Sequence, residues 1–316
     1  MKKRPLIVLT GPTAVGKTAL SVKLAKAVNG EIISADSMQV YTGMDIGSAK
    51  ISKEEMEGIP HHLIDVLDPS EEFNIVKFKE LSLKAMEEIY AKGKIPIIAG
   101  GTGFYIQSVL YDIAFENNED ERTYRNELEN IAKEPDGTLK LFQMLKECDP
   151  KSAEIIHQNN VKRVIRALEF FKETGLTISE HNEEQKQNES PYNFCYFVLN
   201  DDRDKLYENI EKRVDIMLEN GLLDEVKTLH EKGYTKDMVS MQGLGYKEIL
   251  EYFNGEISLE RAVYLIKRDT RHFAKRQLTW FRREKEISWV NKQDFSYDEE
   301  KILKHILDKL KENAIL

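Results

Sequence analysis

The pattern of apolar and polar positions predicts short buried strands separated by amphipathic helices. Four apolar runs have the length and composition of buried parallel strands: 6–9, 31–34, 95–99 and 194–199. A fifth run, 287–290, could be another strand. Helical periodicity fills the intervals over 76–90, 206–232, 259–281 and 299–311. This alternation predicts a doubly wound α/β core, a mainly parallel sheet with helices on both faces, whose ligands bind at the carboxyl ends of the strands.

A long stretch between the third and fourth strands, about residues 117–192, has helical character and no good strand. It begins in an acidic loop at 116–121 and ends with a polar run at 183–190. Connections inside α/β cores are usually far shorter than this. We therefore expect a core formed by residues 1–116 and 193–316, and a helical insertion domain, 117–192, that moves relative to the core.

Composition and charge narrow the class of protein. No apolar run approaches a membrane span, and too few apolar residues precede Gly11 for a signal peptide. Cys148 and Cys195 belong to no metal-ligand cluster, so we expect a reduced, cytoplasmic protein. The net charge of −9 argues against bulk affinity for nucleic acid, but residues 261–285 carry nine Lys or Arg against two acids. A basic face open to RNA or polyphosphate is therefore expected.

The strongest motif is a phosphate loop between the first strand and a helical segment that runs to Val28. Its residues fit the required strand–loop–helix setting and are Gly11, Pro12, Thr13, Ala14, Val15, Gly16, Lys17 and Thr18. The glycines let the backbone form a concavity of N–H donors, Lys17 adds a positive charge, and the Thr18 hydroxyl can bind Mg²⁺. The alternative is a tight glycine turn with a solvated lysine. The loop predicts a diphosphate or triphosphate site without identifying the ligand.

Two polar segments follow the next strands and should lie near the phosphate loop. The first contains Asp36, Ser37, Met38 and Gln39. Asp36 could bind Mg²⁺ through water, act as a general base or cap a turn, and Ser37 and Gln39 could read a base edge or be ordinary loop residues. The second, Gly100 to Tyr105, has three glycines in four positions and offers the Thr102 hydroxyl to a ligand, unless it is only a tight turn.

Several basic residues remain ambiguous from spacing alone. Arg163 and Arg166 share a helix face, and spacing alone favours a solvated face for this pair. Arg213 lies on another amphipathic helix, where a surface salt bridge or a free surface charge is the simpler explanation. The loop at 241–247 is glycine-punctuated and could be only a connection. In the basic helix at 267–283, lysines and arginines could bind phosphates while aromatic side chains stack on bases. The competing interpretation buries those aromatic side chains in the core.

Taken in order, the motifs resemble the tRNA dimethylallyltransferase family. The resemblance rests on six blocks that span nearly the whole chain: 11–18, 36–41, 100–105, 163–169, 241–247 and 275–282. It implies a P-loop α/β fold and transfer of a dimethylallyl group from dimethylallyl diphosphate to the N6 amine of adenosine 37, beside the tRNA anticodon. Diphosphate is the second product.

The resemblance also implies roles for the strand-end residues. The loop amides, Lys17, Arg213 and Mg²⁺ on Thr18 would stabilise charge that develops on the leaving diphosphate. The implied diphosphate-binding residues are Gly11, Thr13, Ala14, Val15, Gly16, Lys17, Thr18 and Arg213. Asp36 would accept the amine proton as the C–N bond forms, and Thr102 would hold the diphosphate near its scissile oxygen. Water must be excluded, because it would hydrolyse the allylic centre.

The same resemblance implies a tRNA anticodon stem-loop as the partner. Target and neighbouring bases would contact Asp36, Ser37, Met38, Gln39, Thr102, Gln242, Gly243, Gly245 and Tyr246. The insertion would clamp the stem-loop through Arg125, Arg163 and Arg166, and the RNA backbone would contact Lys275, Arg276 and Arg282. We expect a monomer that does not bind membranes. The alternatives are a phosphate-loop kinase for a nucleoside or small metabolite, and a non-catalytic RNA-binding module switched by NTP.

Overall fold

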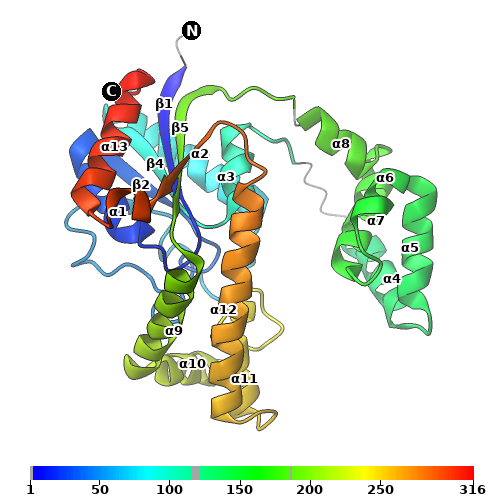
Figure 1. The fold of residues 1–316 in the computed structure, drawn as a ribbon. Coiled ribbons are helices and arrows are strands. Elements are labelled where there is room, and N and C mark those ends of the chain that lie inside the picture. The colour runs from blue at the N-terminus through cyan, green and yellow to red at the C-terminus, as the bar shows by residue number, and fades with distance from the viewer. Residues whose placement is uncertain (1–2, 116–120, 186) are drawn as a thin grey trace. The chain divides into compact units, whose positions relative to one another are not determined.

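The computed structural model describes residues 3–115, 121–185 and 187–316, which form two compact units (Figure 1). The core unit comprises Met1–Leu110 and Pro191–Leu316, and the helical insertion comprises Tyr111–Ser190. The chain leaves the core unit after Leu110 and returns to it at Pro191, within a few residues of the expected boundaries at 116 and 193. Most of the acidic loop, residues 116–120, lies outside the described residues.

The core unit is built on a six-stranded, all-parallel sheet with the order β3-β2-β4-β1-β5-β6. The strands are β1 (Arg4–Thr10), β2 (Gly30–Ala35), β3 (His61–His62), β4 (Ile95–Gly100), β5 (Tyr192–Asn200) and β6 (Ile287–Asn291). All five predicted strands are confirmed. β3 was not predicted, because two residues are too few to show a period. Gly100 pairs with both Thr10 and Ala35, so the segments that follow β1, β2 and β4 begin side by side.

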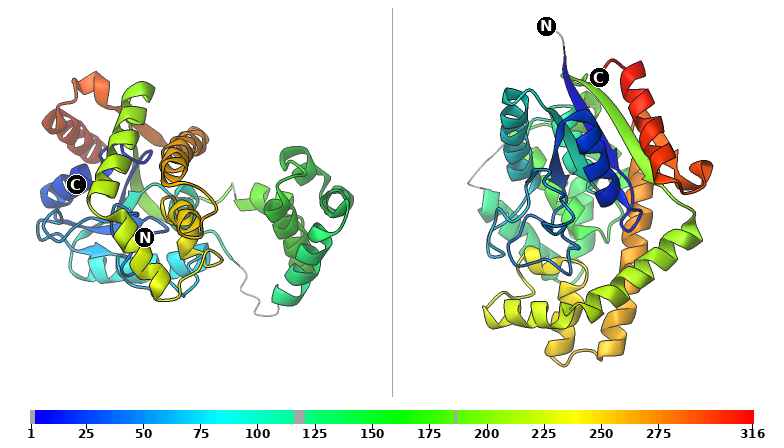
Figure 2. Two further views of the ribbon diagram at one scale, coloured as in Figure 1. Left: turned by 90° about the horizontal axis from the view of Figure 1, so that it is seen from below. Right: turned by 90° about the vertical axis from the view of Figure 1, so that its left-hand side faces the viewer.

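Helices cover both faces of the sheet, as the α/β pattern predicts. The core unit contains α1 (Lys17–Val28), α2 (Ile75–Ala91), α3 (Gly103–Leu110), α9 (Arg203–Glu219), α10 (Leu222–Glu231), α11 (Tyr246–Phe253), α12 (Leu259–Phe281), α13 (Glu299–Glu312) and the 3-10 turns η1 (Ser240–Gln242) and η2 (Lys292–Phe295). Ile7 and Leu9 of β1 pack in one cluster with α1 and α13. Leu6 and Val8 alternate with them and are equally buried on the face that carries α2. Helices α9 to α12 lie beyond the carboxyl ends of the strands (Figures 1 and 2).

The helical periodicity over 206–232 is confirmed. It corresponds to two helices, α9 and α10, which are separated at Asn220 and Gly221. Gly221 has a φ of +96°, a left-handed conformation that glycine adopts without a steric cost and that ends a helix. Apolar periodicity continues across the break because both helices bury residues on their core-facing side, including Val214 and Val226.

The helical insertion has its own apolar core. It contains α4 (Glu121–Lys133), α5 (Gly137–Cys148), α6 (Pro150–Ile155), α7 (Val161–Thr174) and α8 (Ile178–Gln185), with no strand among its described residues. Leu128, Leu141, Leu145, Val164 and Leu168 pack together at its centre. Across both units, no helix in the described part of the chain is long and apolar enough to cross a membrane.

Candidate active site

The phosphate loop has the backbone of an anion cradle. It follows β1 directly and ends at Gly16, which precedes α1. Gly11, Ala14 and Gly16 have φ values of +148°, +62° and +95°, so the chain reverses sharply within six residues. A Cβ on Gly11 would lie 2.2 Å from the carbonyl oxygen of Leu199, which leaves no room for a side chain. The strand–loop–helix setting predicted from the sequence is therefore present.

The tight packing of Gly11 predicts a loss of stability on substitution. Gly11→Ala should lower the free energy of unfolding by about 2–3 kcal/mol, because the methyl group meets a backbone carbonyl in a strained conformation. Gly43→Ala is the matched control: Gly43 also has a positive φ, +72°, but nothing lies within 4 Å of its Cβ position. The control should cost about 1 kcal/mol. Equal losses in urea unfolding of the two variants would contradict the steric argument.

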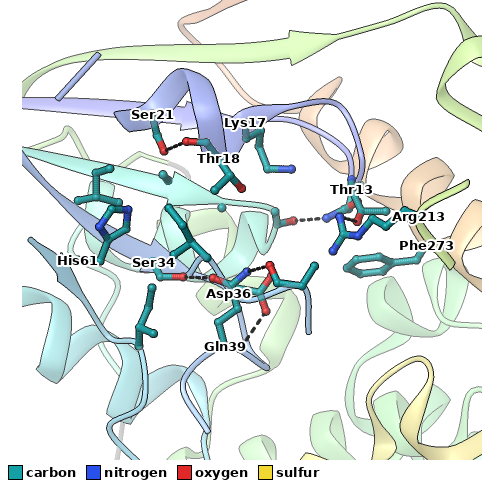
Figure 3. Close-up of a pocket in the computed structure, with 18 residues that line it drawn as sticks. Thr13, Lys17, Thr18, Ser21, Ser34, Asp36, Gln39, His61, Arg213 and Phe273 are labelled. Atoms are coloured by element: carbon teal, nitrogen blue, oxygen red, sulfur yellow. Dashed lines mark hydrogen bonds between the residues drawn. The ribbon is translucent and has the colours of Figure 1, made fainter. Parts of the chain in front are cut away.

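Lys17 lies in the pocket beneath the loop (Figure 3). Its Nζ donates a hydrogen bond to the Pro12 carbonyl at 2.7 Å. Burial and, to a smaller extent, the charge of Arg213 lower the pKa of Lys17, Asp36 opposes them, and together these effects bring it to about 7. A lysine poised near neutrality takes up a proton when an anion arrives, so the site favours a negatively charged ligand.

Arg213 reaches the phosphate loop from α9. Its Nη1 donates to the Thr13 hydroxyl at 3.2 Å, and it lines the same pocket as Lys17 (Figure 3). Burial lowers the pKa of Arg213, with Asp36 again opposing. The interpretation of Arg213 as a solvated surface charge is therefore wrong. Two cations beside a cradle of backbone N–H groups have the chemistry to bind a polyphosphate anion.

Asp36 caps its own turn and also faces the pocket. It follows β2, and its Oδ1 accepts hydrogen bonds from the backbone N–H groups of Met38, at 2.8 Å, and Gln39, at 3.4 Å. In the described part of the chain, Oδ2 accepts none. One carboxylate oxygen thus holds the side chain in place, while the other is available to a ligand. The structural and the chemical interpretations of Asp36 are compatible.

Two neighbouring polar residues form hydrogen bonds within the protein. The Gln39 amide contacts the Ser34 hydroxyl at 3.2 Å and donates to the carbonyls of Ser48, at 3.4 Å, and Ala49, at 3.3 Å. The backbone of Thr102 joins β2 to the start of α3, since its N–H donates to the Ala35 carbonyl. Thr102 does not line the pocket that holds Asp36. Contacts of Gln39 and Thr102 with substrates stay predictions.

Several residues that line the pocket were not assigned to the site from the sequence. Gln277 and Phe273 reach the pocket from α12, and His61 reaches it from β3 beside an apolar end that contains Ile51 and Ile64. Burial lowers the pKa of His61, so its imidazole is neutral at pH 7. These residues come from distant parts of the chain. The basic helix at 267–283, whose aromatic side chains were considered for stacking on bases, contains Phe273, and the block 275–282 contains Gln277, but nothing in the sequence marks His61.

The expected RNA-contacting loops of the core unit lie together. The Met38 sulfur would be 2.7 Å from a Cβ on Gly243, so the loops at 36–39 and 241–247 touch. Gln242 is exposed, whereas Tyr246 is fully buried and its hydroxyl donates to Glu225 at 2.7 Å. Glu225 also accepts the backbone N–H groups of residues 45–47. The Tyr246 side chain therefore supports these loops from inside, and any RNA contact here must come from the exposed neighbours.

Helix α12 combines an exposed basic side with a buried aromatic side, and its contacts with RNA stay a prediction. Lys275, Arg276 and Arg282 are exposed, while Phe281 is fully buried in the core. Trp280 packs against Gly103, where a Cβ would lie 2.2 Å from the indole ring. One side of the helix thus faces the core, and the opposite side, which faces solvent, is basic.

The arginines of the helical insertion differ in availability. Arg125 of α4 forms a bidentate ion pair with Glu169 of α7, with both N···O distances at 2.7 Å, and the Glu169 side chain is 1% exposed. Arg125 therefore fastens two helices together. Arg163 is exposed and Arg166 half-buried, and neither forms an ion pair within the described residues. Their expected RNA contacts stay predictions.

Comparison with known proteins identifies close relatives. A family model described as IPP transferase matches residues 39–284. The chain is 63% identical over 295 residues to a tRNA dimethylallyltransferase of Lachnoclostridium phytofermentans, covering 93% of this chain and 94% of that protein. It is 54% identical over 301 residues to the enzyme of that name from Acetivibrio thermocellus, covering 95% and 96%. The crystal structure of a tRNA isopentenylpyrophosphate transferase from Bacillus halodurans superposes with a TM-score of 0.73 at 44% identity, covering 99% and 98%.

Proposed function

The chain belongs to the IPP transferase family, and we infer that the pocket between the phosphate loop, Arg213 and Asp36 is its active site. The protein is a tRNA dimethylallyltransferase, which prenylates adenosine 37 of tRNA. One observation carries the assignment of the site: two half-buried cations and a carboxylate line a single pocket at the carboxyl edge of the sheet. A kinase would also use a phosphate loop, but the family membership leaves that alternative without support.

We propose that the loop binds the diphosphate of dimethylallyl diphosphate as a leaving group. As the allylic C–O bond breaks, negative charge grows on the departing oxygen and positive charge on the allylic carbon. The loop N–H groups, Lys17 and Arg213 stabilise the negative charge. The adenosine N6 forms the new C–N bond, and Asp36 accepts the proton that N6 loses. Diphosphate and N6-dimethylallyladenosine are the products.

The residues present fit a magnesium ion. Thr18 is exposed at the start of α1, and its hydroxyl has no hydrogen-bond partner in the described part of the chain. Those described residues contain no cluster of three or more His, Cys, Asp or Glu that could hold a metal by themselves. Mg²⁺ commonly binds through one or two protein oxygens, waters and substrate phosphates, so Thr18 with a diphosphate suits it. When bound, it supplies further positive charge to the leaving group.

We propose that the RNA is held by both units. In the core unit, Asp36 and Gln39 line the pocket, the loop at 241–247 touches the loop that carries them, and the basic side of α12, which also contributes Gln277 to the pocket, is exposed. In the helical insertion, Arg163 and Arg166 offer cations without internal partners among the described residues. An anticodon loop supplies unpaired bases that can be turned out of the stack at modest cost. The protein is proposed to act as a monomer.

Arg163 provides a test of the insertion's role. Arg163→Ala should weaken tRNA binding several-fold and reduce the slope of log affinity against log salt by about one, because one phosphate contact is lost. Affinity for dimethylallyl diphosphate should not change. Lys133→Ala, which removes another exposed cation of the insertion, is the matched control. An unchanged tRNA dissociation constant for Arg163→Ala would remove this residue from the interface.

The reaction itself is tested with unmodified tRNA. We expect incubation with dimethylallyl diphosphate and Mg²⁺ to yield N6-dimethylallyladenosine in the anticodon loop, detected by nucleoside mass spectrometry. ATP in place of the prenyl donor should give no phosphorylated product. Transfer of a phosphoryl group without prenylation would overturn the assignment.

A further inference from the structure

The side chain of Gln277 joins two loops of the active site. It extends from α12 and is 6% exposed. Its Oε1 accepts a hydrogen bond from the backbone N–H of Thr13 at 2.9 Å, and its Nε2 donates to the carbonyl of Gly101 at 3.0 Å. Each end of the amide thus has a partner of the required polarity, so the orientation of the side chain is fixed. One amide connects the loops that follow β1 and β4.

The contact with the second loop is close. A Cβ on Gly101 would lie 2.1 Å from Nε2 of Gln277, so glycine is required for the amide to approach the backbone. Loss of the Gln277 amide would leave the half-buried N–H of Thr13 and the buried C=O of Gly101 without these partners. The two loops would then separate or rotate until water or another group satisfied them.

The loop that follows β1 connects Gln277 to Arg213 through Thr13. Gln277 holds Thr13 by its backbone N–H, and the hydroxyl of the same residue accepts a hydrogen bond from Nη1 of Arg213 at 3.2 Å. A continuous series of contacts therefore runs from α12 through Thr13 to Arg213. All three residues line the pocket (Figure 3 labels Thr13 and Arg213).

We propose that Gln277 is a positioning residue, which sets Thr13 and, through Thr13, orients Arg213 toward the diphosphate of the donor. The inference rests on the proposed function only in taking Arg213 as a diphosphate ligand. Gln277 does not contact the reacting atoms. It fixes the guanidinium before the donor binds, and this preorganisation lowers the cost of binding charge at the transition state.

A double-mutant cycle tests the proposal. Gln277→Leu in the full-length protein should lower kcat/KM for dimethylallyl diphosphate roughly tenfold, with saturating tRNA. In an Arg213→Ala background, the same substitution should cost no more than about twofold, because the residue through which it acts is gone. An equal loss of kcat/KM in both backgrounds would overturn the proposal, because a general destabilisation of the fold would lower activity whether or not Arg213 is present.

Three further measurements make the result specific. The tRNA dissociation constant of Gln277→Leu should be unchanged, because its exposed neighbours on α12 remain. Thr279→Val, an exposed position on the same helix, should behave as the unmodified protein. If Arg213→Ala alone leaves kcat/KM for the donor unchanged, Arg213 is not a diphosphate ligand. If Arg213→Ala lowers kcat/KM but the effects of the two substitutions are additive, Arg213 keeps its role and only the positioning role of Gln277 is rejected.

Gln277→Glu keeps the proposal testable if the leucine variant does not fold. A carboxylate still accepts the N–H of Thr13 but cannot donate to the Gly101 carbonyl. Its activity relative to the unmodified protein, compared at each pH, should rise as pH falls, because a protonated glutamate regains the donor. A ratio that does not vary with pH would contradict the assigned geometry.

Discussion

Replacing Asp36 with asparagine is expected to lower kcat by about 10³-fold, within the range for loss of a general base. The amide oxygen of asparagine can still accept the hydrogen bond from the Met38 N–H, so the turn after β2 should persist. What is lost is the ability to take the proton from N6. The KM for dimethylallyl diphosphate should change little, because the diphosphate is held by the loop and Arg213.

The matched control is Asp68→Asn. Asp68 also caps a turn, accepting the N–H of Ser70 at 2.9 Å, but it is not among the pocket-lining residues. Single-turnover prenylation of an anticodon stem-loop measures the chemical step in both variants. Normal turnover of Asp36→Asn together with weak donor binding would show that Asp36 serves binding rather than proton transfer.

Lys17→Met is expected to lower kcat/KM for the donor by roughly 10²–10³-fold, as expected when a preorganised cation is removed from a leaving group. It should also stabilise the free protein. The pKa of Lys17 is about 7 in the folded chain against 10.5 for an ordinary lysine, so the unfolded chain binds more protons between those values. The free energy of unfolding of the unmodified protein therefore rises with pH between those two values. Below about pH 7, the whole destabilisation that results from burying Lys17 is present.

The gain from Lys17→Met should be about 4 kcal/mol at pH 7 and should disappear only above about pH 11, beyond the pKa of the unfolded lysine. Donor affinity of the unmodified protein should fall as pH rises above 7, because binding then requires uptake of a proton. Lys17→Arg, which keeps its charge throughout, should lack this pH dependence. Thermal unfolding and titration calorimetry at several pH values measure both effects. A Lys17→Met variant that is no more stable at pH 7 would contradict the lowered pKa.

The local chemistry of the site was predictable because it is encoded in short segments. The phosphate loop, the position of Asp36 after β2 and the glycines after β4 each lie within a few residues of a strand end. A parallel sheet brings such ends together, so their proximity follows from the strand assignment. Arg213 illustrates the limit: its place in the pocket depends on the path of α9, and its sequence neighbours permit a surface charge equally well.

Other features depend on packing between distant segments. The burial of Tyr246 and the pairing of Arg125 with Glu169 are set by helices that lie far apart in the chain. The break at Gly221 interrupts a pattern that both flanking helices continue. Gln277 is polar and buried because two backbone groups, from loops more than 170 residues away, require it there. Periodicity reports which side of a helix is apolar but not which polar residue is enclosed.

The position of the helical insertion in the chain has a consequence for synthesis. β1 is flanked by β4 and β5, and the ribosome makes β5 only after the whole of Tyr111–Ser190. At roughly 5–20 residues per second, this delay is on the order of ten seconds. During that interval one edge of an apolar strand has no neighbour and can pair with another nascent chain. Chaperone cover is therefore needed most while the insertion is being translated.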